Sequence, residues 1–253
     1  MDDLHPTLLP SASWAAALGL REPLPIALLS LPALAGPIPP PLPTLLSATE
    51  QDRYQSFRHP KRQQEWLGGR ITAKAAVATL LTTGTRPAPA ATTLVIASDH
   101  AGKPRLELPG LAQTVHLSIS HSHNQAVAMA SFHPCGIDLQ ISTSTAARVK
   151  ERFTTPAEET LLTTSLGEHS ETMQLTLLWA AKEALRKMMP ISPLLGFHDA
   201  VLTGIQPADK AHLLLFSSPK MCHNTPHPLR VVATVLGEYA LALSVLPTTA
   251  TTD

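Results

Sequence analysis

Residues 179–189 read WAAKEALRKMM, a sequence of strong helix formers. A helical period of 3.6 residues places the apolar side chains of this region on one face: Leu178, Ala181, Leu185 and Met188. Glu183 and Lys187 then lie together on the opposite face. Such a pair is often an ordinary solvated ion pair, worth a few tenths of a kcal/mol. The pattern therefore predicts a helix that packs on one side and presents a carboxylate and an ammonium on the other.

Two stretches upstream give the polar face of this helix further partners. Residues 118–123 read SISHSH and residues 135–140 read CGIDLQ. Asp138 and Glu183 offer two hard oxygen ligands of the kind that Mg²⁺ takes together with waters and phosphate oxygens. Three cations could hold a pyrophosphate beside that ion: His121, Lys182 and Lys187. This set favours phosphoryl transfer by positioning and charge neutralisation.

His121 and His123 also permit a zinc site. Alternate positions of a strand point two imidazoles to the same side. No third histidine or cysteine stands at a suitable spacing, however, so zinc is disfavoured and a phosphate-binding role for His121 is preferred.

Composition describes a globular chain with no preference for long polyanions. The 253 residues are 44% apolar, enough for a buried core, and 19 basic residues balance 19 acidic ones. Two cysteines form no disulfide framework, and the start MDDLHP is unlike a signal peptide. No apolar stretch reaches membrane-spanning length. These features predict a cytoplasmic protein.

The order of predicted elements in the second half repeats that of the first, a helix, a hairpin and a pair of strands. Lys74 precedes Lys187 by 113 positions, and Ala126 precedes Ala240 by 114. We therefore expect an α+β protein made of two similar lobes, residues 1–130 and 131–253, with the ligand site at the seam of a pseudo-two-fold pair.

The N-terminal lobe carries the most basic part of the chain. Ser47 and Glu50 have the spacing of a capping box, which predicts a helix start, and His59-Pro60 separates that helix from a second one. Six cations fall here: Arg53, Arg58, Lys61, Arg62, Arg70 and Lys74. Such a run is usually a solvated surface, but it could also hold phosphates.

An ordered set of these motifs resembles the Sfp-type 4′-phosphopantetheinyl transferases. The set consists of Gly102-Lys103-Pro104, SISHS at 118–122, Gly136-Ile137-Asp138 and the pattern WxxKEAxxK from Trp179 to Lys187. Weaker matches extend it over roughly residues 47–190. The resemblance implies the family's architecture, a pseudo-dimer of two α+β lobes, which agrees with the duplication.

The resemblance also implies an enzyme and its residues. Coenzyme A would be the substrate, with its pyrophosphate on Mg²⁺. The implied metal ligands are Asp138 and Glu183, with Gln140 at a third position. Lys187 and Lys182 would stabilise the pyrophosphate. The implied contacts to the rest of coenzyme A are Arg53, Lys103, Pro104, Ser120 and His121.

In the implied reaction a serine of an acyl or peptidyl carrier protein attacks the β-phosphate and releases adenosine 3′,5′-bisphosphate. The catalytic residues would be Asp138, Glu183 and Lys187, with Glu183 accepting the serine proton directly or through a metal-bound water. The expected partners are thus coenzyme A and an apo carrier protein of fatty-acid, polyketide or nonribosomal-peptide synthesis. We expect neither nucleic acid nor membrane as a partner, and a monomer.

Gln140 departs from the family pattern, which often has an acid there. A neutral amide is a weaker Mg²⁺ ligand than a carboxylate. Gln140 therefore motivates one alternative, a non-catalytic relative that binds coenzyme A or a carrier protein without turnover. A dinucleotide-binding oxidoreductase is excluded by the lack of a glycine-rich strand–turn–helix motif.

Overall fold

A computed structural model describes residues 5–35, 41–82, 87–189, 195–218 and 228–247. The chain divides into two compact units. Unit 1 comprises residues 1–11 and 24–133, and unit 2 comprises residues 12–23 and 134–253. The division falls three positions after the expected lobe boundary. Residues 12–23 belong to the second unit, which the sequence did not predict.

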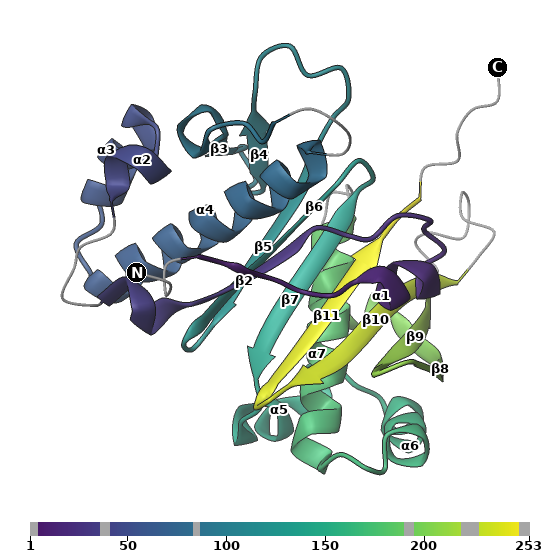
Figure 1. Ribbon diagram of the computed structural model, residues 1–253. Coiled ribbons are helices and arrows are strands. Elements are labelled where there is room, and N and C mark those ends of the chain that lie inside the picture. Colours follow the sequence, from purple (N-terminus) through teal and green to yellow (C-terminus); the bar gives the residue numbers. More distant parts are fainter. Residues whose placement is uncertain (1–4, 36–40, 83–86, 190–194, 219–227, 248–253) are drawn as a thin grey trace. The chain divides into compact units, whose positions relative to one another are not determined.

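Unit 1 has a six-stranded antiparallel sheet in the order β1-β2-β6-β5-β4-β3 (Figure 1). Its strands are β1 (Thr7–Leu8), β2 (Ile26–Ser30), β3 (Val95–Ser98), β4 (Pro104–Glu107), β5 (His116–Ser122) and β6 (Gln125–Ser131). Its α-helices are α2 (Leu42–Leu45), α3 (Ala48–Gln55) and α4 (Pro60–Leu81). Single 3₁₀ turns are η2 (Leu31–Ala35) and η3 (Ala91–Thr93). The long helix α4 packs against β2, β5 and β6.

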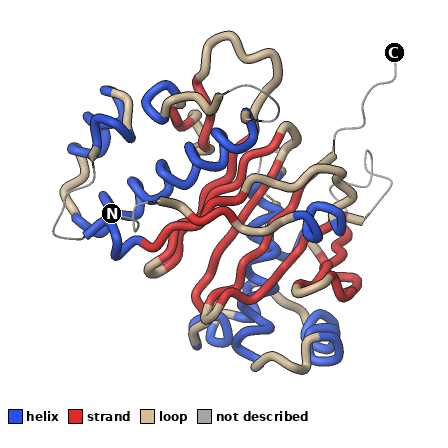
Figure 2. Tube along the Cα trace, viewed as in Figure 1, coloured by secondary structure: helices blue, strands red, loops and turns tan. Residues whose placement is uncertain are grey.

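Unit 2 has a five-stranded antiparallel sheet in the order β7-β11-β10-β9-β8. The strands of both sheets are red in Figure 2. Its strands are β7 (Cys135–Ile141), β8 (Val201–Ala208), β9 (Ala211–Ser217), β10 (Leu229–Leu236) and β11 (Tyr239–Val245). Its helices are α1 (Ala12–Ala17), α5 (Ser144–Arg148), α6 (Pro156–Ser165) and α7 (Glu171–Met188), with 3₁₀ turns η4 (Lys150–Arg152) and η5 (Phe197–Asp199). The long helix α7 packs against β7, β10 and β11.

The two units share one topology, so the predicted duplication and the α+β class are confirmed. The order β2-β6-β5-β4-β3 in unit 1 corresponds to β7-β11-β10-β9-β8 in unit 2. In both units a helix that starts with a capping box and then a long helix separate the first strand from the next. Strand β8 continues through Pro207 to Ala208, and Asp209 and Lys210 form the turn to β9.

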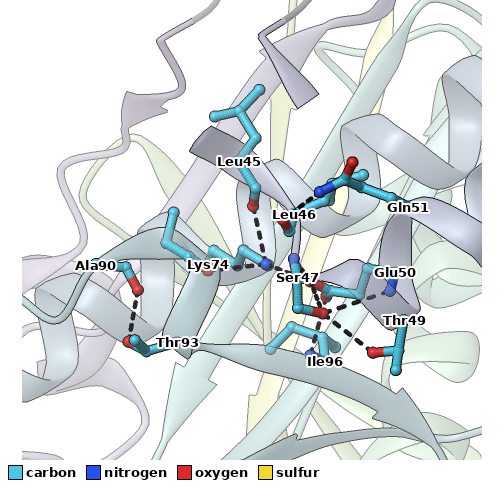
Figure 3. A network of polar contacts seen from close by, with 11 residues as sticks. Leu45, Leu46, Ser47, Thr49, Glu50, Gln51, Lys74, Ala90, Thr93 and Ile96 are labelled. Atoms are coloured by element: carbon cyan, nitrogen blue, oxygen red, sulfur yellow. Dashed lines mark hydrogen bonds and ion pairs between the residues drawn. The ribbon is translucent and has the colours of Figure 1, made fainter. Parts of the chain in front are cut away.

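Each unit contains the same buried ion-pair network. In unit 1, Glu50 closes the capping box with Ser47, accepts a hydrogen bond from the amide of Ile96 at 3.1 Å and pairs with Lys74 at 2.5 Å (Figure 3). The Lys74 ammonium also donates to the carbonyls of Leu45 and Ala91. The network thus joins α3, α4, η3 and β3.

Unit 2 repeats this network around Glu158 and Lys182, which lie 2.7 Å apart and are each 1% exposed. Glu158 closes the capping box with Thr155 and accepts from the amide of Leu202 at 2.9 Å. Lys182 also donates to two carbonyls, those of Phe153 and Phe197. Glu50 and Glu158 are 108 positions apart, as are Lys74 and Lys182. The sequence alignment of Lys74 with Lys187 was therefore wrong, because the structural counterpart of Lys74 is Lys182.

A glycine brings α7 against the strand that carries Asp138. The predicted apolar stripe of α7 is buried, with Leu178, Ala181 and Leu185 fully inaccessible. A Cβ on Gly136 would lie only 1.9 Å from the carbonyl oxygen of Ala184, so only glycine permits this separation of β7 and α7.

No helix of the described residues is both long enough and apolar enough to cross a membrane. The proline-rich segment 36–40, Pro190, Cys222 and the C-terminal TTATTD lie outside the described residues. Cys135 is a buried free thiol whose pKa burial raises to about 12.

Candidate active site

Asp138 lies near the middle of β7, on a strand that pairs with β11 opposite Ala242. Its side chain is only 3% exposed, which would be costly for an isolated carboxylate. Lys187 of α7 donates to Asp138 Oδ1 at 2.6 Å, and the Gln140 amide donates to Oδ2 at 2.9 Å. Lys187 also donates to the carbonyl of Ile137 at 3.0 Å. Both carboxylate oxygens are therefore oriented by neighbours, and the ammonium offsets the charge.

Glu183 occupies the same face of α7 as Lys187, as the helical period predicted, and both side chains are partly exposed. The Glu183 carboxylate accepts a hydrogen bond from Arg186 at 3.0 Å. Burial raises the pKa of the Glu183 carboxyl above its usual range. Arg186 and Lys187 oppose that rise, and the negative charge of Asp138 adds to it. The influence of Asp138 shows that the two carboxylates share one electrostatic environment.

These residues form the unit 2 polar cluster: Asp138, Gln140, Glu183, Arg186 and Lys187. Arg186 stacks on the ring of Phe197 at 4.7 Å, and its Nε has no hydrogen-bond partner among the described residues. Two carboxylates and an amide oxygen are suitable ligands for Mg²⁺, since this ion prefers oxygen and is satisfied by one or two carboxylates. The cluster therefore fits the metal that the sequence predicted.

Lys182 takes no part in this cluster. Its side chain is 1% exposed, and its ammonium has three partners, the Glu158 carboxylate and the carbonyls of Phe153 and Phe197. Burial lowers the pKa of Lys182, although Glu158 counteracts the effect. An ammonium whose three donors are all used inside the protein is not placed to bind a pyrophosphate. The same holds for Lys74, which the basic segment had included.

Unit 1 contains a pocket of about 830 Å³ between α3, α4 and the strands β3 to β5. Its lining includes three of the cations of the basic segment, Arg53, Arg62 and Arg70, together with His121 and Pro104. The aromatic rings of Phe57 and Trp66 line it as well. We call this the unit 1 pocket. Of the predicted contacts to coenzyme A, it contains Arg53, Pro104 and His121.

The sequence named Arg70 only as one of six cations that could hold phosphates, not as a contact to coenzyme A. Its guanidinium stacks on Trp66 at 4.7 Å, and its buried Nε has no hydrogen-bond partner among the described residues. Burial lowers the pKa of Arg70, with Glu50 opposing this effect. A buried guanidinium N–H without a protein partner can be satisfied by a water or by an anion, which makes Arg70 a candidate anion contact. Only its membership of the basic segment signalled this role in the sequence.

The remaining predicted residues lie around the unit 1 pocket or away from it. Ser120 is 6% exposed and belongs to the opposite side of β5 from His121 and Ile119, which line the pocket. Lys103 precedes β4, and its amide donates to Asp99. His123 is an exposed turn residue with φ of 51°, so it does not continue β5 beside His121, and the strand geometry of the zinc alternative is absent.

Comparison with known proteins matches residues 134–243 to the family model "4'-phosphopantetheinyl transferase superfamily". A holo-[acyl-carrier-protein] synthase of Lactococcus lactis subsp. lactis (strain IL1403) is 40% identical over 84 residues, 33% of this chain and 71% of that protein. The synthase of Geobacillus kaustophilus (strain HTA426) is 43% identical over 77 residues, 30% of this chain and 60% of that protein.

Among solved structures, a holo-(acyl-carrier-protein) synthase from Bacillus anthracis str. Ames, crystallised in complex with CoA (3′,5′-ADP), is 27% identical with a TM-score of 0.39. The match covers 42% of this chain and 91% of that one. The family match coincides with the part of unit 2 that carries Asp138, Glu183 and Lys187.

Proposed function

Because the chain belongs to the 4′-phosphopantetheinyl transferase superfamily, we propose that it transfers the 4′-phosphopantetheine group of coenzyme A to a serine of an acyl or peptidyl carrier protein. One observation carries this proposal. Within the matched residues 134–243, Lys187 and Gln140 orient both oxygens of Asp138, and Glu183 shares the electrostatic environment of that carboxylate.

Asp138 and Glu183 would hold a Mg²⁺ ion, and the side-chain oxygen of Gln140 would be a weaker third ligand. When bound, the ion supplies positive charge that neutralises the pyrophosphate of coenzyme A. Lys187 is already fixed by Asp138 and the carbonyl of Ile137, so it orients the carboxylate and adds a second positive charge. Arg186 adds another cation, whose Nε has no partner among the described residues.

The reaction joins the carrier serine oxygen to the phosphorus that bears pantetheine. The bond from that phosphorus to the bridging oxygen breaks, and adenosine 3′,5′-bisphosphate leaves. Glu183 is the residue we propose to accept the serine proton, since its partly exposed carboxylate lies on the same face of α7 as Lys187, which would stabilise the pyrophosphate. Nothing covalent forms on the protein, so positioning and charge carry the catalysis.

The unit 1 pocket is the proposed site of the nucleotide end of coenzyme A. Arg70 would pair with a phosphate through its unpartnered Nε, and Arg53 and His121 would add further positive charge or hydrogen bonds. Phe57 and Trp66 offer aromatic faces for adenine. Ser120 and Lys182 are left out of this proposal because they are buried on other faces or fully paired.

The chain as a monomer and its cytoplasmic location are further proposals. One chain already contains two units of the same topology, which supports a monomer. Light scattering of the purified protein would measure this directly. A buried free thiol at Cys135 is compatible with a reducing compartment.

The decisive experiment measures the intact mass of an apo carrier protein after incubation with this chain and coenzyme A, with and without Mg²⁺. We expect a metal-dependent gain of one phosphopantetheine group on the carrier serine. Coenzyme A bound tightly without any gain on fatty-acid, polyketide and nonribosomal-peptide carriers would favour the non-catalytic relative instead.

Glu183→Ala tests the residue assignment in the same assay. Removal of the proposed metal ligand and base should reduce turnover by about a hundredfold or more. Glu171→Ala is the matched control, because Glu171 lies in the first turn of the same helix and is 74% exposed. Normal turnover by a folded Glu183→Ala protein would refute the mechanism.

A further inference from the structure

Two histidines and a glutamate converge on unit 2 outside the polar cluster. Glu168 and His169 lie in the turn between α6 and α7, and His212 lies on β9. Their ligand atoms all lie within 4.8 Å of one another. Among the described residues this is the group of three or more His, Cys, Asp or Glu side chains with such convergence. We call it the Glu–His cluster.

The two distances from the Glu168 carboxylate to the imidazoles are closer to those of a metal site than to those of direct hydrogen bonds. Glu168 Oε1 is 3.5 Å from His169 Nε2 and 3.4 Å from His212 Nε2. A charge-assisted hydrogen bond between such groups would be about 2.7–2.9 Å long. A tetrahedral zinc ion with ligands at about 2.0–2.1 Å separates neighbouring ligand atoms by about 3.3 Å. The one oxygen therefore stands near tetrahedral spacing from both nitrogens.

The surroundings hold these side chains in a form ready for a metal. The Gln174 amide donates to the carbonyls of Leu166 and His169 and fixes the turn. His212 is held by the sheet, where it pairs with Ala233 on β10. Burial lowers the pKa of His212, an effect that Glu168 opposes and His169 increases. Neutral imidazole is the form that coordinates metals.

We propose that Glu168, His169 and His212 bind a divalent transition metal, best Zn²⁺, with a water at the fourth position. Two imidazoles and one carboxylate favour zinc, cobalt or nickel over Mg²⁺. The metal would tie the α6–α7 turn to β9 and stabilise unit 2.

This metal site is separate from the Mg²⁺ ligands proposed above. The cluster residues Glu168 and His169 immediately precede Ser170, the N-cap of α7, whereas Glu183 lies thirteen positions further along the helix. At 1.5 Å per residue this is a separation of about 20 Å along the helix axis. The zinc proposal therefore does not depend on the proposed transferase reaction.

Zinc titration of the untagged full chain, stripped with a chelator that is then removed, tests the proposal. Isothermal calorimetry with ZnCl₂ should show one binding site. Zinc should also raise the melting temperature of the protein. His212→Ala and Glu168→Gln should each weaken that site roughly tenfold or more, since even the loss of an outer-shell partner costs 10–100-fold. His198→Ala is the control, because His198 is an exposed histidine of the same unit outside the cluster.

Two outcomes would overturn the proposal. One is a wild-type chain whose melting temperature and calorimetric titration do not respond to zinc. The other is that the folded Glu168→Gln and His212→Ala proteins both keep the zinc affinity and stoichiometry of the wild type. Cobalt gives an independent reading, because four-coordinate Co²⁺ absorbs strongly in the visible range. That absorption should be present in the wild type and lost in His212→Ala but not in His198→Ala.

Discussion

Unit 1 and unit 2 have the same frame but different functional groups on it. Both use a capping-box glutamate that reaches a buried lysine of the long helix and an amide of the next strand. The same geometry recurs at an offset of 108 positions, where Glu158 and Lys182 correspond to Glu50 and Lys74. A polar network this deeply buried stabilises the fold only when every partner is present, so it persists in both copies as a set.

At the same offset, four charged residues of one unit correspond to uncharged residues of the other. The helix positions that match Arg53 and Arg70 of the unit 1 pocket hold Leu161, which packs against the unit 2 core, and Leu178, which belongs to it. In the reverse direction, Glu183 and Lys187 correspond to Ala75 and Thr79. The shared network therefore maintains the same fold in both units, while substitutions at a few positions give each unit different charged residues.

The largest effect on stability is expected when one of the two buried lysines is removed. Lys182→Met leaves the Glu158 carboxylate buried without its cation, which should cost about 3–5 kcal/mol of unfolding free energy. Lys74→Met should cost a similar amount in unit 1, because its partners are equivalent. Urea unfolding, monitored by circular dichroism, measures both. A loss below about 1 kcal/mol in one unit alone would show that the two networks are not energetically equivalent.

Two glycines provide the next test. Gly136→Ala places a methyl group 1.9 Å from the carbonyl oxygen of Ala184, and backbone cannot move aside as a side chain can. The expected loss of stability is about 3 kcal/mol, together with a wider spacing of Asp138 and Lys187 that lowers turnover. Gly68→Ala in α4 is the matched change.

The methyl group of Gly68→Ala would meet the Cδ2 end of Leu31 at 2.3 Å, which can rotate, and alanine favours a helix interior by about 1 kcal/mol over glycine. We therefore expect Gly68→Ala to be near neutral in thermal unfolding. Equal losses for the two variants would mean that the approach of β7 to α7 is not tighter than its counterpart in unit 1.

Arg70→Leu exchanges a pocket residue for the type found at its counterpart, Leu178. Loss of a charge-assisted bond to a phosphate should weaken coenzyme A binding by about 2 kcal/mol, or roughly thirtyfold. Stability should not fall, since burial disfavours the guanidinium and its Nε has no protein partner among the described residues. Calorimetry with coenzyme A measures the first effect. Unchanged affinity would exclude Arg70 from the proposed nucleotide site. The transferase proposal would not be affected, because the carrier-protein assay tests it separately.

The sequence predicted those features that depend on local signals. The capping box at Ser47 and Glu50, the apolar stripe of α7 and the alternating strands of the duplicated sheets all follow from spacing within a few residues. The Ala126–Ala240 correspondence also holds, because both residues lie in the matched strands β6 and β11.

Partners that are distant in the chain could not be predicted in this way. Spacing puts Lys182 on a helix face, but only packing brings the Glu158 carboxylate to it from another helix, and so the buried lysine was expected to bind phosphate. Likewise, only packing brings Lys187 to Asp138, a strand residue 49 positions away. Segment 12–23 joins unit 2 for a similar reason, since its Trp14, Ala15 and Leu18 are buried by contacts that no local pattern encodes.

Gln140→Glu should have the smallest effect on stability and turnover. It tests what residue 140 does in the unit 2 polar cluster. The wild-type amide donates to Asp138 Oδ2 at 2.9 Å, which a carboxylate cannot do. Without metal, the two adjacent carboxylates should repel each other and reduce stability by about 1 kcal/mol or less. With Mg²⁺, the new carboxylate is a better ligand than the amide, so turnover should be retained and half-maximal activity reached at lower Mg²⁺. Melting temperature in chelator and a Mg²⁺ titration of carrier modification measure the two effects. An increased Mg²⁺ requirement would mean that residue 140 serves to orient Asp138 rather than to bind the ion.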